Sequence, residues 1–371
     1  MELKEYRFDE VTINFDKKRV PLSGAQREKR QGNFRYYGAQ GVIDHIDDFI
    51  FDGTYLLIAE DGENLKSKKQ NIAQVVEGQF WVNNHAHIVQ GNELCNTRYL
   101  CYLLNSMDLS GYVTGSAQPK LSQANLNAVT LFLPSITVQE RIVECLYLFD
   151  KKIAVNQKIN DNLQKQAAAL FANFYDQAET EVGFTEMIQI LGGGTPKTGE
   201  SSYWNGDIPF FTPKDVGFPY TLTTEKTITE EGLAHCNSRL YPINTVFVTA
   251  RGTVGKVGLP GVPMAMNQSC YALVGKDTHQ LLVYFYTLKA VDRLKHKASG
   301  AVFDAITTRD FEAENIMKLS DDDTKAFLDV AEPIYQAVLN NSIENLRLAE
   351  LRDSLLPKLM NGEIDVSGIQ L

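Results

Sequence analysis

The feature that most constrains the fold of this chain is a pattern that occurs twice, about 185 residues apart. Each copy is an irregular stretch of about 135 residues, rich in aromatic residues and glycine, followed by a long helical pattern. The first helical pattern covers residues 138–176 and follows Leu133–Ser135, and the second covers residues 324–361 and follows Lys318–Ser320. Solenoid proteins repeat every 20–50 residues or so, which is much shorter. The sequence therefore predicts a duplicated domain.

We expect four segments: a first lobe at residues 1–137, a first long helix at 138–181, a second lobe at 182–320, and a second long helix with a tail at 321–371. The predicted fold class is α+β, with two similar mixed α/β lobes separated by two long helices that form an antiparallel coiled coil. Because the lobes are duplicated, this pairing predicts pseudo-two-fold symmetry.

The order of short elements is also similar in the two lobes. Tyr55–Ala59 and Thr245–Thr249 are apolar runs of strand length, and Tyr99–Asn105 and Leu281–Leu288 favour helices. Sequence identity between the lobes is low, so the order of elements carries the comparison. Two further pairs of segments agree: the openings Phe8–Val11 and Phe184–Met187, and the loops Gly115–Pro119 and Ala298–Gly300.

The helical patterns carry apolar residues and asparagines at alternating steps of three and four, which is typical of a coiled-coil seam. Seam asparagines favour one register at a cost in stability. Pro357 predicts a kink or a late end of the second helix, and Gly362 is a plausible stop. An alternative is two amphipathic helices, each packed on its own lobe. The residues predicted to pair the helices are Ile153, Asn156, Leu163, Leu170, Val338, Asn341, Leu348 and Leu355, with Asn160 and Asn345 also in the seam and the charged Arg352 interrupting it.

The net charge of −10 is unevenly distributed. Eight of the ten excess negative charges lie on the two helical segments, so the lobes are nearly neutral and each is able to present a basic face to DNA. Paired helices of this length span roughly 50 Å, or on the order of 15 base pairs. Two unlike lobes on such a spacer suggest that one chain reads two separate half-sites.

Basic side chains with neighbouring tyrosine or glutamine are the candidate DNA contacts, because lysine and arginine neutralise phosphates and polar side chains read base edges. The candidates of the first lobe are Lys17, Lys18, Arg19, Arg27, Lys29, Arg30, Arg35, Tyr36, Tyr37 and Gln40. Those of the second lobe are Lys197, Lys214, Arg251, Lys256, Arg293, Lys295 and Lys297. For each one alone, an ordinary solvated surface charge is the alternative.

No catalytic, cofactor or metal site is predicted. Gly252–Lys256 lacks the full spacing of a phosphate loop, and Gly192–Gly194 lacks that of a dinucleotide loop. His85 and His87 are expected on one face of a strand, without a cluster that completes a metal site. Nuclease carboxylates are a minor alternative for Asp44, Asp47, Asp48, Glu60 and Asp61.

Several motifs carry a resemblance to a known family. Leu191–Lys197 with Tyr203–Asp215 resembles the opening of a target recognition domain in the DNA-specificity subunits of type I restriction–modification systems. Tyr36–Asp44 with Ile58–Gly62 resembles another version of that domain. Further similar segments are Gly115–Leu121, before the first long helix, and Leu351–Ile364, at the C-terminal end. The first lobe departs from the pattern because it lacks the glycine-rich opening of the second.

The resemblance implies a non-catalytic chain that recognises a bipartite site on double-stranded DNA. Two methyltransferase subunits would dock on the paired helices, and restriction and translocation subunits would join them. The five cysteines lack CxxC spacing and the N-terminus lacks an apolar core, so a cytoplasmic protein without a membrane anchor is expected. The competing hypotheses are a stand-alone nuclease or methyltransferase fragment, and a coiled-coil scaffold that does not bind DNA.

Overall fold

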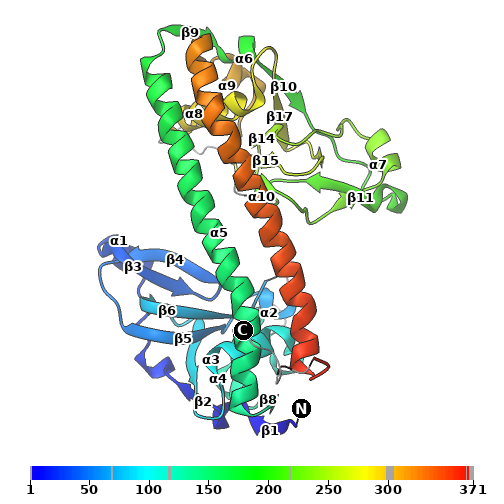
Figure 1. Ribbon diagram of the computed structural model, residues 1–371. Coiled ribbons are helices and arrows are strands. Elements are labelled where there is room, and N and C mark those ends of the chain that lie inside the picture. Colours follow the sequence, from blue (N-terminus) through cyan, green and yellow to red (C-terminus); the bar gives the residue numbers. More distant parts are fainter. Residues whose placement is uncertain are drawn as a thin grey trace. The chain divides into compact units, whose positions relative to one another are not determined.

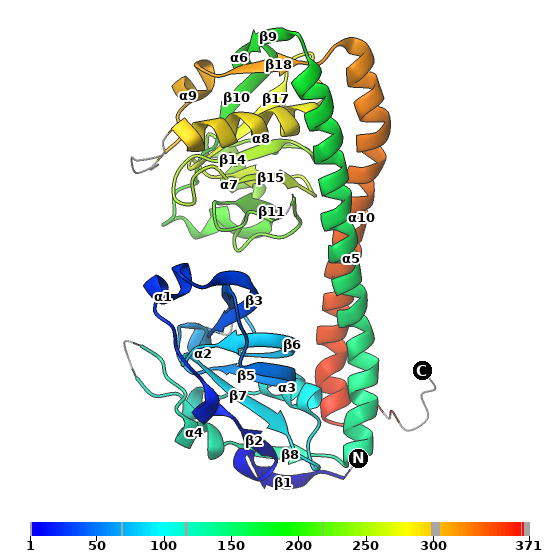
Figure 2. The same ribbon diagram turned by 90° about the vertical axis from the view of Figure 1, so that its left-hand side faces the viewer.

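The computed structural model describes residues 2–67, 70–115, 118–217, 219–297, 305–364 and 366. The chain divides into two compact units (Figures 1 and 2). Unit 1 contains residues 1–151 and 348–371, and unit 2 contains residues 152–347. Each unit therefore combines one lobe with a part of both long helices. None of the helices in the described part of the chain has a stretch long and apolar enough to cross a membrane.

Unit 1 is built on a six-stranded sheet with the strand order β2-β7-β5-β6-β3-β4. All neighbouring strands in it are antiparallel except β3 and β6. The strands of the unit are β1 (Lys4–Arg7), β2 (Thr12–Asn14), β3 (Gln31–Gly38), β4 (Gly41–Ile46), β5 (Phe51–Ala59), β6 (Ala73–Val82), β7 (Ala86–Gly91) and β8 (Thr130–Leu133). The helices are α1 (Gly24–Glu28), α2 (Asn64–Ser67), α3 (Thr97–Ser106), α4 (Gln123–Asn127) and the start of α5 (Ile136–Gln177), with 3-10 turns η1 (Phe8–Glu10), η2 (Asp16–Lys18) and η3 (Ser110–Tyr112).

Unit 2 contains a five-stranded sheet, β10-β17-β14-β15-β12, and a three-stranded sheet, β13-β11-β16. Helix α8 packs on strands β14, β15 and β17 (Figure 2). The strands are β9 (Thr180–Gly183), β10 (Ile188–Gly192), β11 (Trp204–Phe211), β12 (Tyr220–Thr221), β13 (Thr227–Ile228), β14 (Val246–Thr249), β15 (Val257–Pro260), β16 (Ala265–Met266), β17 (Cys270–Gly275) and β18 (Asn315–Lys318). The helices are α6 (Phe184–Met187), α7 (Glu230–Ala234), α8 (Gln280–Lys297), α9 (Thr308–Glu312) and α10 (Asp321–Met360), with the 3-10 turn η4 (Ser201–Tyr203).

The duplication predicted from the sequence is visible in how each unit begins its lobe and enters its long helix. Strand β1 pairs antiparallel with β8, which leads into α5, and β9 pairs antiparallel with β18, which leads into α10. The next residue after each opening strand is a buried phenylalanine, Phe8 or Phe184. Their backbone N–H groups donate to the carbonyls of Val129 (2.9 Å) and Glu314 (2.8 Å). The two lobes therefore share the same arrangement of their first and last strands.

The two long helices pair antiparallel within each unit. In unit 2 the Asn156 amide donates to Asn345, and the Asn341 amide donates to Asn160, so the partner number falls as the α5 number rises. In unit 1 the same order continues with the ion pair between Asp150 and Arg352. The predicted antiparallel coiled coil is confirmed.

The ends of the long helices lie close to the predicted positions. Helix α5 starts two residues earlier than the pattern indicated, and α10 runs through Pro357 to Met360. Gly362 follows with a φ of 79°, the left-handed conformation that favours glycine after a helix. Pro357 thus lies in the last turn of α10 and does not end the helix. Its ring removes one backbone hydrogen bond and crowds the preceding turn.

The predicted helix-pairing residues contribute to two different cores. Leu163, Leu170 and Val338 pack in the main core of unit 2, where Phe171 of α5 stacks on Phe285 of α8. Leu355 packs in the main core of unit 1, next to residues of α3 and β5. Ile153 and Leu348 are half-buried. The helices are thus integral to both units.

Candidate nucleic-acid interface

The arginines of the first lobe's basic run are bound to carboxylates of the same lobe. Arg19 pairs with Glu60 (3.0 Å) and Asp16 (3.4 Å). Its guanidinium also donates to the carbonyl of Ala86 (2.7 Å). Arg27 donates to Asp44 (2.8 Å), and this hydrogen bond is the main reason that the pKa of Asp44 lies below its ordinary value.

Arg30 completes this set by pairing with Asp47 (2.8 Å) and Asp48 (3.5 Å), while its guanidinium lies over the Trp81 ring. A guanidinium in this geometry has its donors directed at the lobe itself. We therefore interpret Arg19, Arg27 and Arg30 as residues that tie β4, β6 and the end of β5 to the N-terminal segment.

The same pairs account for the acidic residues considered as nuclease carboxylates. Each of the five has a cationic or histidine partner, including Asp61, which lies 2.7 Å from Nδ1 of His85. His85 precedes β7 instead of lying within it, so it does not share a strand face with His87 as expected. Within the described ranges, no group of three or more His, Cys, Asp or Glu side chains is arranged to hold a metal ion.

Two tyrosines predicted as DNA contacts lie in the core. Tyr36 is fully buried and its hydroxyl accepts from the backbone N–H of Leu22 (2.9 Å), and Tyr37 packs edge-on against Phe80. They are consecutive in β3 and are buried in two different clusters, Tyr36 with Ile46 and Trp81, and Tyr37 with Phe51 and Phe80. Direct contact of either ring with DNA is therefore not supported.

The remaining candidates of the first lobe are exposed. Lys17, Lys18 and Lys29 form no ion pair with any residue that the structure describes, and Lys18 lies over the Phe15 ring. Arg35 donates to the carbonyl of Glu77 (2.6 Å), and Gln40 lies on the loop between β3 and β4. Among the candidates of this lobe, these three lysines therefore have their charge open to a phosphate.

The second lobe collects four exposed cations around one turn. The turn, Gly252–Lys256, joins β14 to β15, and its glycines have φ values of 82° and 73°. This geometry confirms a strand-to-strand turn. The side chains are Lys214, Arg251, Lys256 and Lys295, called the lobe 2 basic patch below.

Contacts between the segments hold these cations near one another. The hydroxyl of Thr253 donates to the carbonyl of Pro213, next to Lys214 (3.2 Å). Gly255 lies so close to Lys295 that a Cβ at this position would come within 2.6 Å of Cε. Lys256 and Lys295 also line one pocket of about 470 Å³. None of the four pairs with an acidic side chain in the described part of the molecule, so their charge is open to a phosphate.

Three other candidates of the second lobe differ from this patch. Arg293 donates to the carbonyl of Asn315 (2.5 Å) and to the hydroxyl of Tyr175 (3.1 Å), and Lys297 pairs with the buried carboxylate of Glu314. Both therefore stabilise the packing of α8 against β18. Lys197 is exposed on the loop before η4, where its carbonyl accepts from the Trp204 indole (3.1 Å).

One exposed cation of the first lobe was not singled out in the sequence. Lys120 is half exposed and pairs with Glu60 (3.2 Å), and the neighbouring carbonyl of Leu121 accepts from His87 (2.8 Å). Both residues end the motif Gly115–Leu121, of which Ser116 and Ala117 lie outside the described residues, as does the loop Ala298–Gly300. A lone lysine after a proline gives no pattern by which to select it.

Comparison with known proteins identifies the lobes. The family model described as the type I restriction modification DNA specificity domain matches residues 2–165 and 180–318. A putative type I restriction enzyme specificity subunit of Haemophilus influenzae is 35% identical over 138 residues, which are 37% of this chain and 35% of that protein. The HindI specificity subunit of the same organism is 23% identical over 401 residues, and the match covers 84% of each protein.

The fold agrees with that of a solved relative. The crystal structure of the S subunit of a type I restriction–modification system from M. genitalium superposes with a TM-score of 0.57 at 13% identity, over 97% of this chain and 96% of that one. The family model alone matches well over half of the chain, in two separate segments. The chain therefore belongs to the type I restriction–modification DNA specificity family, and its role is DNA recognition rather than catalysis.

Proposed function

We propose that each lobe binds one half of a bipartite target on double-stranded DNA. The observation that carries this proposal is the presence of two matched specificity domains in one chain, built on one frame but with different surfaces. Two unlike surfaces would read two unlike half-sites. The paired helices α5 and α10 would set the distance between those half-sites.

The chain would act in the cytoplasm as the recognition component of a larger enzyme. Two methyltransferase subunits would dock on it, and restriction and translocation subunits would complete the assembly. Relatives named as type I restriction enzyme specificity subunits support this assignment. The chain would choose the sequence, and its partners would carry out methylation and cleavage.

The lobe 2 basic patch gives the proposal a direct test. The double variant Lys214→Gln with Lys256→Gln removes two exposed charges that have no acidic partner among the described residues. A matched control is Lys276→Gln with Lys318→Gln, because these exposed lysines line a different pocket of the same unit. Both double variants lower the net charge equally.

In the assembled methyltransferase, we expect the patch variant to bind DNA roughly tenfold or more weakly, with a salt dependence shallower by about one to two ion equivalents. The control should match the wild type. Equal binding by wild type and patch variant would refute the patch as a phosphate contact.

Sequencing of methylated sites in cells that carry the whole system tests the bipartite target. We expect one motif with two unlike halves separated by a spacer of unspecified bases. Modification of DNA by the purified chain alone, with magnesium or S-adenosylmethionine, would support the enzyme alternative. If the lobes do not bind DNA in the full assembly, the scaffold alternative is supported.

A further inference from the structure

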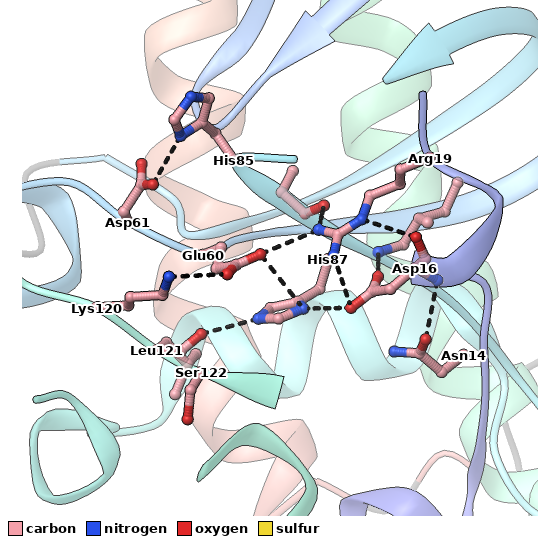
Figure 3. Close-up of polar contacts among 12 residues, drawn as sticks. Asn14, Asp16, Arg19, Glu60, Asp61, His85, His87, Lys120, Leu121 and Ser122 are labelled. Atoms are coloured by element: carbon pink, nitrogen blue, oxygen red, sulfur yellow. Dashed lines mark hydrogen bonds and ion pairs between the residues drawn. The ribbon is translucent and has the colours of Figure 1, made fainter. Parts of the chain in front are cut away.

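A buried histidine in unit 1 has both ring nitrogens directed at hydrogen-bond acceptors (Figure 3). His87 of β7 is 1% exposed. Its Nδ1 lies 2.6 Å from Oδ2 of Asp16, and its Nε2 lies 2.8 Å from the carbonyl oxygen of Leu121. A carbonyl oxygen has no proton to donate, so Nε2 carries one.

The second ring proton follows from the surroundings of Asp16. Its other oxygen, Oδ1, already accepts the backbone N–H of Ile88 (2.8 Å), and Arg19 lies 3.4 Å from Oδ2. These donors favour the ionised carboxylate, which only accepts, so Nδ1 of His87 carries a proton as well. The geometry therefore requires an imidazolium.

The charged groups around His87 come from three further segments. Asp16 begins the η2 turn and Arg19 directly follows that turn. Glu60 follows β5, with its Oε2 at 4.0 Å from Nδ1 of His87, and Lys120 pairs with Glu60 (3.2 Å). The exposed His85 and its half-buried partner Asp61 lie beside this cluster in Figure 3.

These groups shift the pKa values in the direction that the geometry requires. Burial by itself would lower the pKa of His87, but the hydrogen bonds to Asp16 and Leu121 and the charges of Asp16 and Glu60 raise it above its ordinary value. Burial would likewise raise the pKa of Asp16, but His87, the Ile88 N–H and Arg19 lower it.

The imidazolium joins two exposed basic segments. Asp16 begins the turn that carries Lys17 and Lys18, and Leu121 directly follows Lys120. If His87 loses a proton, one ring nitrogen presents a lone pair to an oxygen less than 3 Å away. That repulsion breaks one of the two contacts and releases the turn or the loop.

We propose that His87, as an imidazolium, is a positioning residue that fixes the η2 turn against the loop of Leu121 and so holds Lys17 and Lys18 in place to contact DNA phosphates. This inference rests on the proposed function, because it assigns these lysines to the DNA-binding surface of the first lobe. DNA binding by that surface then depends on the protonation of His87. The contribution is fully present below the unfolded-state pKa of histidine, near about 6.5, and is lost as the pH rises through the higher folded-state pKa.

The first measurement is the protonation state of His87 in the full chain, by NMR of ¹⁵N-labelled histidine. We expect both ring nitrogens to be protonated at neutral pH and to titrate above the ordinary histidine range. A single protonated nitrogen at neutral pH would overturn the proposal. The NMR measurement uses the wild-type chain, so its outcome does not depend on whether any variant folds.

The second measurement is amide hydrogen exchange of residues 16–19, 120 and 121 in the wild type, His87→Gln and the matched control His85→Gln. We expect lower protection factors, in which the intrinsic pH dependence of exchange is removed, in His87→Gln at every pH, and in the wild type only once the pH has risen through the folded-state pKa. His85→Gln should follow the wild type, because His85 is exposed. Unchanged exchange in His87→Gln would overturn the positioning role, whatever DNA binding does.

The third measurement is the affinity of the full chain for a mixed-sequence DNA duplex as a function of pH and salt. We expect His87→Gln to bind roughly tenfold more weakly than the wild type below the folded-state pKa, with a shallower salt slope. Lys17→Gln with Lys18→Gln should show the same loss without a change in exchange. If that lysine variant binds as the wild type does, the DNA role of this surface is wrong, while the exchange data separately decide the positioning role.

Discussion

The polar pair Asn160 and Asn341 in the helix seam allows a quantitative test of how the two long helices are held in register. The Asn341 amide donates to Oδ1 of Asn160 at 2.8 Å, and Asn160 is 6% exposed. We consider Asn160→Leu, Asn341→Leu and the double variant. All three replace an amide by an apolar side chain of similar size.

The expected energies follow from what each substitution leaves unpaired. A single leucine gains burial of apolar surface but leaves the opposite amide without its seam partner, which costs about 1–3 kcal/mol. We expect each single variant to be destabilised by about 1 kcal/mol, since the added apolar burial offsets part of that cost. The double variant leaves no unpaired amide at this layer, so it should be at least as stable as the wild type. The interaction energy of the cycle should be about 2 kcal/mol.

The chain has two tryptophans, and each unit contains one of them. In a Trp81→Phe background, Trp204 reports the unfolding of unit 2, where both asparagines lie. Urea denaturation followed by Trp204 fluorescence then gives the free energy of unfolding of each variant. Effects of the single substitutions that add within about 0.5 kcal/mol would show that the two amides do not interact, and would refute the reasoning.

Three further outcomes are expected. Arg352→Met should destabilise unit 1 by about 1 kcal/mol, because it leaves the half-buried Asp150 without its cation. Adding Asp150→Asn should recover most of that loss. The fluorescence of Trp81 in a Trp204→Phe background measures both effects. Gly91→Ala should lower the free energy of unfolding of unit 1 by about 2–3 kcal/mol in the same assay, because its Cβ would lie 1.8 Å from the carbonyl oxygen of Cys95. The control Gly111→Ala has open space around its Cβ, so its free energy of unfolding should stay within about 0.5 kcal/mol of the wild type. Removing one heptad from α5 and one from α10 in register should shorten the spacer of the methylated motif by about three base pairs, and an unchanged spacer would contradict the helices' role as a ruler.

Periodic and local features of the sequence predicted the fold well. The seam asparagines repeat at helical spacing in both long helices, and the structure pairs Asn156 with Asn345 and Asn160 with Asn341. The charged interruption Arg352 also has a partner, Asp150, at the matching place on α5. Such patterns are visible in one dimension because the spacing of side chains along a helix is constant.

The candidate DNA contacts show where sequence reasoning stops. Lys17 and Arg19 belong to one basic run, yet the first is exposed and the second is bound by the nearby Asp16 and by Glu60 from a distant segment. Tyr36 and Tyr37 are consecutive in β3 and both are buried, in two different clusters, and no pattern in the sequence marks that burial. Whether a cation is available depends on which carboxylates the fold brings near it, sometimes from more than forty residues away along the chain.

The sequence by itself determined the duplication, the two long helices and the polar layers between them, because these depend on spacing within one segment. Only the tertiary structure decided which cations remain exposed, that His87 lies between Asp16 and Leu121, and that the lobe 2 basic patch gathers around one turn. Those properties arise from contacts between segments far apart in the chain. Burial and pairing of charges are set by such contacts and by the water they exclude, and not by the identity of neighbouring residues.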